Sequence, residues 1–142
     1  MDATMMAYPL TLTSVLERHA RMFPNVEIVS RAPNASIVRH DGATFVKRSK
    51  KLASALRKRG LSKGDRVATL MWNHGPHLEA YFGIPCAGYV LHTLNLRLHQ
   101  DDLAFIVNHA NDQFVIVDDV LLPLWQKVAP LVNVAKVFVV RW

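Results

Sequence analysis

Four polar residues lie in or directly after apolar runs of the sequence, at positions from which a side chain could act on a ligand. They are Asn73, His74, His92 and Asn95. Imidazole rings and side-chain amides both donate and accept hydrogen bonds, and an imidazole can also carry a proton near neutral pH. Ligands of open α/β sheets collect beyond the carboxyl ends of the strands. We therefore take these four residues as candidates for a pocket edge, although a histidine on a strand, as at His92, is more often a core residue.

The other ionisable residues that stand out have structural interpretations. His74, His77 and Glu79 match no HExxH pattern, and at helical spacing Glu79 lies on a different side from His77, so we expect no metal-binding residue. Cys86 has no neighbouring histidine or lysine to activate its thiol, and we interpret it as a small buried residue. We interpret Asp118–Asp119 as the cap of the following helix.

Motifs for binding phosphate and for nucleophilic catalysis are absent from the sequence. The segment Asn73–Pro76 reads NHGP, which is neither GxGxxG nor GxxxxGK[ST]. No GxSxG elbow and no pair of carboxylates at catalytic spacing occurs. We therefore assign no catalytic and no cofactor-binding residue to this chain.

The candidate residues would be positioned by strands and helices that alternate along the chain. Strands alternating with helices form βαβ units, and their parallel sheet is covered on both faces. The sequence thus predicts an α/β fold, with parallel-sheet βαβ units and flanking helices, in a single domain over residues 1–142. The predicted strands are Val67–Trp72, Tyr89–Leu94, Phe114–Val117 and Val137–Val140.

Helices and one hairpin complete the predicted elements. The hairpin pairs Glu27–Arg31 with Ser36–His40. Thr44 and Asn73 are expected to cap the helices that follow them, and Pro85 is expected to kink its helix. The predicted helices are Leu12–Phe23, 44–59, a segment from Asn73 past Phe82, Asp101–His109 and Leu121–Val128.

The charge of the chain is concentrated in one region. The formal net charge is +6, and ten of the 17 basic residues fall between Arg39 and Arg66, against two acidic residues. Such a cluster can bind nucleic acid or another anionic surface. Most of it falls on one side of the predicted helix 44–59, and the stronger interpretation is a solvated helix face.

Composition and termini indicate the cellular setting. Apolar residues make up 51% of the 142 residues, which is enough for a core. The single cysteine excludes an internal disulfide. The N-terminus has no basic segment before an apolar run, and no apolar run reaches the roughly 18 residues of a membrane span. We expect a cytoplasmic protein.

Several stretches, in order along the chain, resemble the N-terminal part of AMP-forming acyl-CoA synthetases. These stretches are EIVSR at Glu27–Arg31, GDRVATLMWN at Gly64–Asn73, HLEAYFGIP at His77–Pro85, LHTLNLRL at Leu91–Leu98 and IVNHANDQ at Ile106–Gln113. The resemblance is strongest to medium- and long-chain fatty-acid–CoA ligases and to methylmercaptopropionate–CoA ligases. It covers nearly the whole chain, and it implies that residues 1–142 are a single partial domain, the N-terminal segment of the family's large domain.

The resemblance implies a two-step reaction in the full-length family. Such enzymes use Mg-ATP to convert a carboxylic acid to an acyl-adenylate, from which coenzyme A displaces AMP. The family's phosphate loop, its nucleotide and magnesium motifs and its catalytic lysine have no counterpart in this sequence, so we expect the chain alone to be inactive. Lys47 also departs from the family, which usually has an acidic residue three positions after the expected cap.

Three functions follow from these observations. The first is the N-terminal segment of a fatty-acid–CoA ligase, whose substrate would be a fatty acid or a similar small carboxylic acid. The second is a non-catalytic dimerisation or interaction module, possible because related ligases dimerise through N-terminal regions. The third, and weakest, is a basic nucleic-acid-binding α/β domain. Because no helix follows Val137–Val140, we also expect an exposed apolar edge that drives self-association.

Overall fold

The computed structural model describes residues 8–142. The prediction that the N-terminus is not a signal peptide concerns residues outside this range. The helices are α1 (Leu12–Met22), α2 (Gly42–Lys58), α3 (Gly75–Cys86), α4 (Gln100–Ala110) and α5 (Leu122–Val128), with short 3-10 turns at Asp119–Leu121 and Ala129–Leu131. The strands are β1 (Glu27–Arg31), β2 (Ile37–Asp41), β3 (Arg66–Leu70), β4 (Val90–Thr93), β5 (Asp112–Asp118) and β6 (Lys136–Val140).

The centre of the molecule is a parallel sheet with the strand order β4-β3-β5-β6. Val67 of β3 lies opposite Leu91 of β4 and Phe114 of β5, and Ile116 of β5 lies opposite Phe138 of β6. All three pairings are parallel, which confirms the predicted architecture. Because the strands run in the same direction, their carboxyl ends meet at one edge of the sheet.

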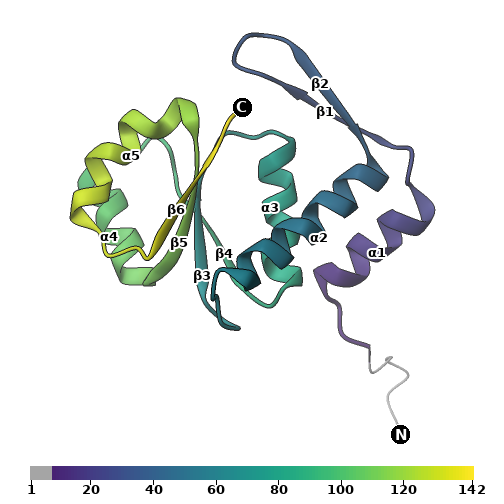
Figure 1. Cartoon of the computed structure of the whole chain (residues 1–142), viewed down its shortest axis with the longest axis horizontal. Helices are drawn as coiled ribbons and strands as arrows, with labels where there is room; N and C mark the ends of the chain where they lie inside the picture. The colour runs from purple at the N-terminus through teal and green to yellow at the C-terminus, as the bar shows by residue number, and fades with distance from the viewer. Residues whose placement is uncertain (1–7) are drawn as a thin grey trace, which may run out of the picture.

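Helices cover both faces of this sheet (Figure 1). On one face α4 and α5 bury Leu103, Val107 and Trp125 against β3 and β5. On the other face α2 and α3 bury Leu56 and Ile84 against the same two strands. Parallel strands need apolar cover on both sides, which explains the apolar run Phe114–Val117 in β5 and the buried Val67, Ala68 and Leu70 in β3.

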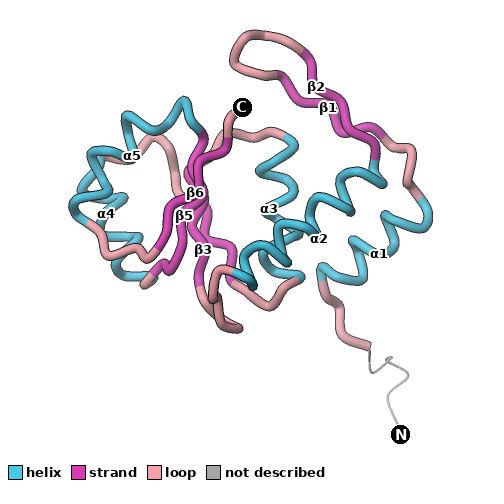
Figure 2. The backbone as a smooth tube through the Cα atoms, viewed as in Figure 1, coloured by secondary structure: helices cyan, strands magenta, loops and turns pink. Residues whose placement is uncertain are grey.

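A third group of elements, α1 and the β1–β2 hairpin, lies beyond α2 and α3 (Figure 2). The hairpin is antiparallel, as predicted, and its turn includes Ala35 with a φ of 65°. Leu16 of α1 forms a small core with Phe45 and Val46 of α2. This group places β1 beside the start of α3.

The start of α2 differs from the prediction. The capping residue is Asp41, whose carboxylate accepts a hydrogen bond of 2.7 Å from the backbone N–H of Thr44. Thr44 is therefore inside the helix and is not its cap. Lys47 consequently lies in the second turn of the helix, and a cation at this distance from the N-terminus does not oppose the helix dipole.

The start of α3 also differs from the prediction by one residue. His74, and not Asn73, occupies the cap position, and its side chain accepts a hydrogen bond from the backbone N–H of His77. Pro85 lies within the last turn, and the helix ends at Cys86. Within residues 8–142 no helix is both long enough and apolar enough to cross a membrane.

Candidate functional site at the carboxyl edge of the sheet

A buried histidine–aspartate pair lies where β3 and β5 end. His74 follows β3 and starts α3, and Asp118 is the last residue of β5. The Nε2 atom of His74 is 2.9 Å from Oδ2 of Asp118, and both side chains are almost fully buried. The same Oδ2 accepts a hydrogen bond of 2.7 Å from the backbone N–H of Trp72. Asp118 therefore fixes the course of the loop between β3 and α3.

The hydrogen bonds of His74 define which nitrogen carries its proton. Nδ1 of His74 accepts the backbone N–H of His77 at 3.3 Å, so this nitrogen carries no proton. The proton is then on Nε2, which donates it to Asp118. The imidazole consequently lies against a buried carboxylate, held by one hydrogen bond on each ring nitrogen.

His77, one turn into α3, is held in the opposite tautomer. Its Nδ1 donates to the carbonyl of Trp72 at 3.1 Å, and its Nε2 accepts from the hydroxyl of Thr69 at 3.0 Å. Burial lowers the pKa of His77 below its ordinary value of 6.5, and the bond to the Trp72 carbonyl only partly opposes this effect. The ring is therefore neutral at pH 7, and its role is to hold Thr69 and the loop at Trp72 in place.

Asp118 has a different role from the predicted helix cap. It occupies the position before the 3-10 turn Asp119–Leu121, but its side chain makes no capping bond. Both of its hydrogen bonds come from residues 72–74, more than forty positions earlier in the chain. Its second oxygen, Oδ1, is buried and has no hydrogen-bond partner among residues 8–142. A buried acceptor of this kind costs free energy, which makes Asp118 an unusual feature of the site.

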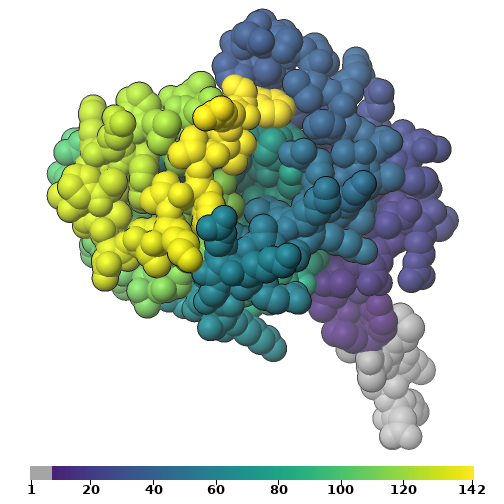
Figure 3. Space-filling view, viewed as in Figure 1, coloured from purple at the N-terminus to yellow at the C-terminus, as the bar shows by residue number. Residues whose placement is uncertain are grey.

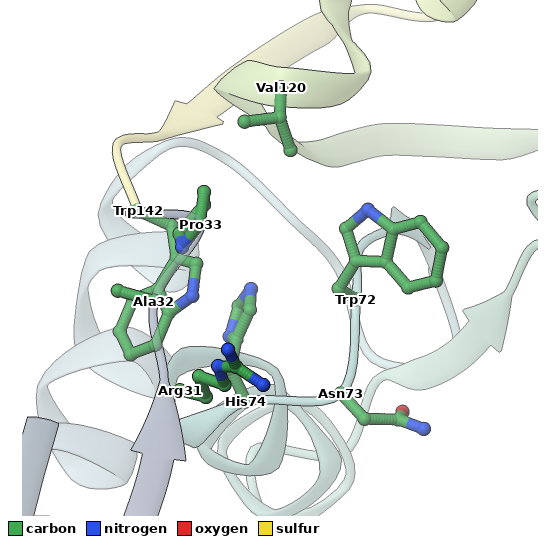
Figure 4. A pocket seen from close by; sticks show the side chains of 8 residues that line it. All are labelled: Arg31, Ala32, Pro33, Trp72, Asn73, His74, Val120 and Trp142. Atoms are coloured by element: carbon green, nitrogen blue, oxygen red, sulfur yellow. The ribbon is translucent and has the colours of Figure 1, made fainter. Parts of the chain in front are cut away.

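Aromatic side chains surround this pair. The indole of Trp142 stacks on His74 with ring centroids 4.4 Å apart. Figure 4 shows Trp72 and Trp142 on opposite sides of His74, with Val120 across the opening. Between them is a cavity of about 500 Å³, whose lining is completed by Asn73 and the hairpin residues Arg31, Ala32 and Pro33.

Two further cavities adjoin the same loop. One, of about 300 Å³, lies between β1 and α3 and reaches His74 and His77. The other, of about 240 Å³, lies between the ends of β3 and β4 and includes Asn95 and Arg97. Asn73 lines all three cavities. Three of the four candidate residues are thus brought together at one edge of the sheet.

The fourth candidate, His92, lies apart from the other three. Its register partner is Ala68, two residues before the end of β3. Its Nδ1 atom is 2.8 Å from Oδ2 of Asp112, at the beginning of β5. Burial raises the pKa of Asp112 above its ordinary value of 3.8, and the bond with His92 opposes this rise. His92 therefore belongs to a polar contact directed toward the amino edge of the sheet.

The residues considered as metal ligands point toward different partners. Glu79 forms an ion pair of 2.5 Å with Arg48 of α2, whereas His77 bonds to Thr69 and Trp72. In the part of the chain that the structure describes, no three His, Cys, Asp or Glu side chains are grouped as a metal site would require. Cys86 is half-buried at the end of α3.

Sequence reasoning missed two residues of this site. Trp142 was outside the candidate set because the sequence offers no sign that a residue after β6 returns to His74. Ser30 was missed because its contact is also long-range: its hydroxyl accepts the backbone N–H of Gly75 at 2.8 Å and ties the hairpin to α3. The alternation of strands and helices could place Asp118 at the correct edge, but it could not identify the partner of its side chain.

The fold and the site together define a class of protein. A parallel α/β sheet with cavities beyond its carboxyl ends is the arrangement of ligand-binding α/β domains. The described residues contribute hydrogen-bonding groups and aromatic surfaces there, and they do not include a nucleophile activated by a base.

Comparison with known proteins identifies the family. Residues 16–140 match the family of AMP-binding enzymes. The chain is 43% identical over 97% of its length to a long-chain-fatty-acid–CoA ligase of Thermus thermophilus and 38% identical over 95% of its length to a medium-chain-fatty-acid–CoA ligase of Ectopseudomonas oleovorans. The chain therefore belongs to the AMP-binding enzyme family, as its sequence motifs indicate.

Solved structures agree on the fold. A long-chain-fatty-acid–CoA ligase of Archaeoglobus fulgidus superimposes with a TM-score of 0.82 over 99% of this chain, at 19% identity. This chain corresponds to 29% of that structure, and to 26% and 25% of the Thermus and Ectopseudomonas ligases. The chain thus spans about a quarter of the length of these relatives.

Proposed function

We propose that residues 1–142 are the N-terminal segment of the large domain of an ATP-dependent fatty-acid–CoA ligase. The observation that carries this proposal is the 43% identity to the Thermus long-chain-fatty-acid–CoA ligase, which extends over 97% of this chain. A second relative, a 3-methylmercaptopropionyl-CoA ligase of Ruegeria lacuscaerulensis, is 36% identical over 95% of the chain. The substrate class that we propose is accordingly a fatty acid or another small carboxylic acid, in the cytoplasm.

The complete enzyme would activate the acid in two steps. ATP would supply an adenylate leaving group, and the thiol of coenzyme A would then attack the activated carbonyl carbon. A carboxylate is a poor acyl donor because its leaving group would be an oxide or hydroxide, and adenylation removes this obstacle.

The residues of this chain do not fit the site for Mg-ATP. Magnesium is usually bound through carboxylates and phosphate oxygens. At the carboxyl edge the Asp118 carboxylate is fully buried, and its Oδ2 is occupied by two donors. Among residues 8–142 no further carboxylate joins it to make a metal-binding group. We therefore assign this chain a structural part in the enzyme, and no step of the reaction.

The structural role that we propose is to hold the loop at the carboxyl edge of the sheet in a fixed conformation. The loop at residues 72–77 is held by Asp118, Thr69 and Ser30 from three different strands. Groups held from several directions keep their geometry when a neighbouring part of a protein packs against them. We infer that the carboxyl edge is presented in this rigid form to the rest of the ligase.

The decisive experiment exchanges segments between related enzymes. Residues 1–142 replace the matching quarter of the Thermus ligase, and the chimera is assayed for pyrophosphate release with ATP and acids of 8 to 16 carbons. We expect a folded chimera that activates these acids, because the electrostatic machinery of catalysis lies in the retained part. The purified chain by itself should release no pyrophosphate under the same conditions.

Controls separate failure of function from failure of assembly. The Thermus ligase without its first quarter serves as the negative control, and its thermal unfolding is followed beside that of the chimera. A folded chimera that activates no acid would count against the proposal. Pyrophosphate release by the isolated chain would contradict the assignment of a purely structural part.

A further inference from the structure

Helix α2 has an unbalanced charge. Its 17 residues contain six cationic side chains and no carboxylate. All six are exposed to solvent. They are Lys47, Arg48, Lys50, Lys51, Arg57 and Lys58.

The six cations face three directions around the helix. Successive residues of an α-helix turn by about 100°, which places Lys47, Lys51 and Lys58 opposite the side that buries Phe45 and Leu56. We call these three lysines the crest. The crest is the part of α2 that points away from the rest of the protein.

The other three cations have neighbours on adjacent helices. Lys50 and Arg57 line a cavity of about 320 Å³ together with Glu17 of α1. Arg48 turns to α3 and pairs with Glu79. By contrast, none of the ion pairs formed by the described residues includes a crest lysine.

The crest is not explained by the stability of the helix. Lys47 and Lys51 are four residues apart, and like charges at this spacing destabilise a helix. A glutamate at either position would replace repulsion by attraction. Lys47 also has no capping role, because Asp41 caps the helix.

An anionic partner would account for three exposed lysines that do not stabilise the helix. The composition of the exposed side of α2 indicates which kind of partner this is. Nucleic-acid sites that recognise bases combine cations with side chains that stack on the bases or bond to them. The exposed side of α2 has no aromatic and no amide side chain. Lysines are strongly hydrated point charges, suited to attraction without fixed geometry. In Figure 3 the atoms of this helix lie on the side that faces the viewer and are not covered by other parts of the chain.

We propose that the α2 crest is a docking surface for the headgroup plane of an anionic lipid bilayer. A row of lysines on a convex face can approach a flat negative surface without a groove. Each lysine near such a surface adds to the attraction, which decreases within a Debye length. The helix is roughly 25 Å long, so its crest can contact several headgroups at once.

The test is co-sedimentation of the whole chain with vesicles. We compare vesicles of phosphatidylcholine alone with vesicles of phosphatidylcholine and phosphatidylglycerol in equal amounts, at low and high salt. The crest variant carries Lys47→Gln, Lys51→Gln and Lys58→Gln. The matched control carries Arg97→Gln, Lys127→Gln and Arg141→Gln, which are exposed cations outside α2. Both variants lower the net charge of +6 by three units.

We expect binding only to the phosphatidylglycerol vesicles at low salt, with at least a tenfold loss for the crest variant and less than a threefold loss for the control. Circular dichroism checks that both variants remain folded. No binding to anionic vesicles, or equal losses in the two variants, would overturn the proposal. It is also overturned if a short DNA duplex binds the chain more tightly than the vesicles do and the crest variant loses that binding.

Discussion

At the scale of single residues, the carboxylate of Asp118 organises the candidate site. One of its oxygens receives the backbone N–H of Trp72 and the Nε2–H of His74, while the other has no partner among residues 8–142. The two bonds join residues that are 46 and 44 positions apart in sequence. The local shape of the loop therefore depends on a distant strand.

Replacing the carboxylate of Asp118 should lower the stability of the folded chain. Asp118→Ala leaves the N–H groups of Trp72 and His74 buried without acceptors, and each such group costs about 1–3 kcal/mol. We expect the free energy of unfolding to fall by about 2–4 kcal/mol, measured by urea denaturation. The double variant with His74→Ala should show a coupling of about 1–2 kcal/mol. A loss below about 0.5 kcal/mol with no coupling would show that the pair does not hold the loop.

A second prediction at this scale concerns pH. The folded protein lowers the pKa of His77 below 6.5, so the unfolded chain takes up a proton at a higher pH than the folded chain does. Stability should be fully retained above pH 6.5 and should decrease as the pH falls from there toward the lowered pKa. His77→Gln removes this titration, and its unfolding free energy should therefore depend less on pH between 7 and 5.

The matched control for this experiment is His109→Gln, since His109 is exposed on α4. It removes one exposed imidazole and so shows how much of any change comes from the loss of a histidine as such. Asp112 acts in the opposite direction, because its raised pKa favours the folded state as the pH falls. Equal pH dependence in the His77 variant and the parent chain would mean that this histidine is not the group being titrated.

At the scale of elements, β6 is an edge strand with exposed apolar side chains. Phe138 and Val140 pack toward α2 and α3, whereas Val137 and Val139 remain 41% and 48% exposed. The strand is paired on one side with β5 and stands at the edge of the sheet. An apolar edge strand of this kind is a template for pairing with another chain.

We therefore expect the isolated chain to associate, and Val139→Lys to reduce the association at unchanged fold. Sedimentation velocity over a range of concentrations measures both. The control Val29→Lys changes a valine of the hairpin with a similar exposure of 51% and should have little effect. A parent chain that sediments as a stable monomer at tens of micromolar would contradict this expectation.

At the scale of the whole molecule, most of the fold could be predicted from the sequence. The apolar runs locate the four parallel strands because the strands of a sheet covered on both faces are rich in apolar residues. The order of the strands in the sheet does not follow from the pattern, since periodicity reports burial and not neighbours. The predicted cap of α2 was wrong by three residues, because Asp41 caps this helix and Thr44 does not. The predicted cap of α3 was wrong by one residue, because His74 takes the place expected for Asn73.

The candidate site could be predicted only in part. The rule for the carboxyl ends of strands groups Asn73, His74 and Asn95, and these three residues line adjoining cavities. It misleads at His92, because the rule considers position along a strand and not the direction in which a side chain points. The role of Asp118 could not be predicted, since its partners become neighbours only after the strands have paired.

The parallel pairing of β3 with β4 and β5 also decides the time order of folding. The β1–β2 hairpin closes over a turn of a few residues, whereas β3 can meet β4 only after the segment that contains α3 has been brought round. Its pairing with β5 must wait for a second such crossover. Pairings between distant segments form slowly, and hairpins and helices form quickly. During synthesis, β3 therefore leaves the ribosome with both of its hydrogen-bonding sides open. Pairing with β4 closes one side, and the other remains open until residues 112–118 have followed.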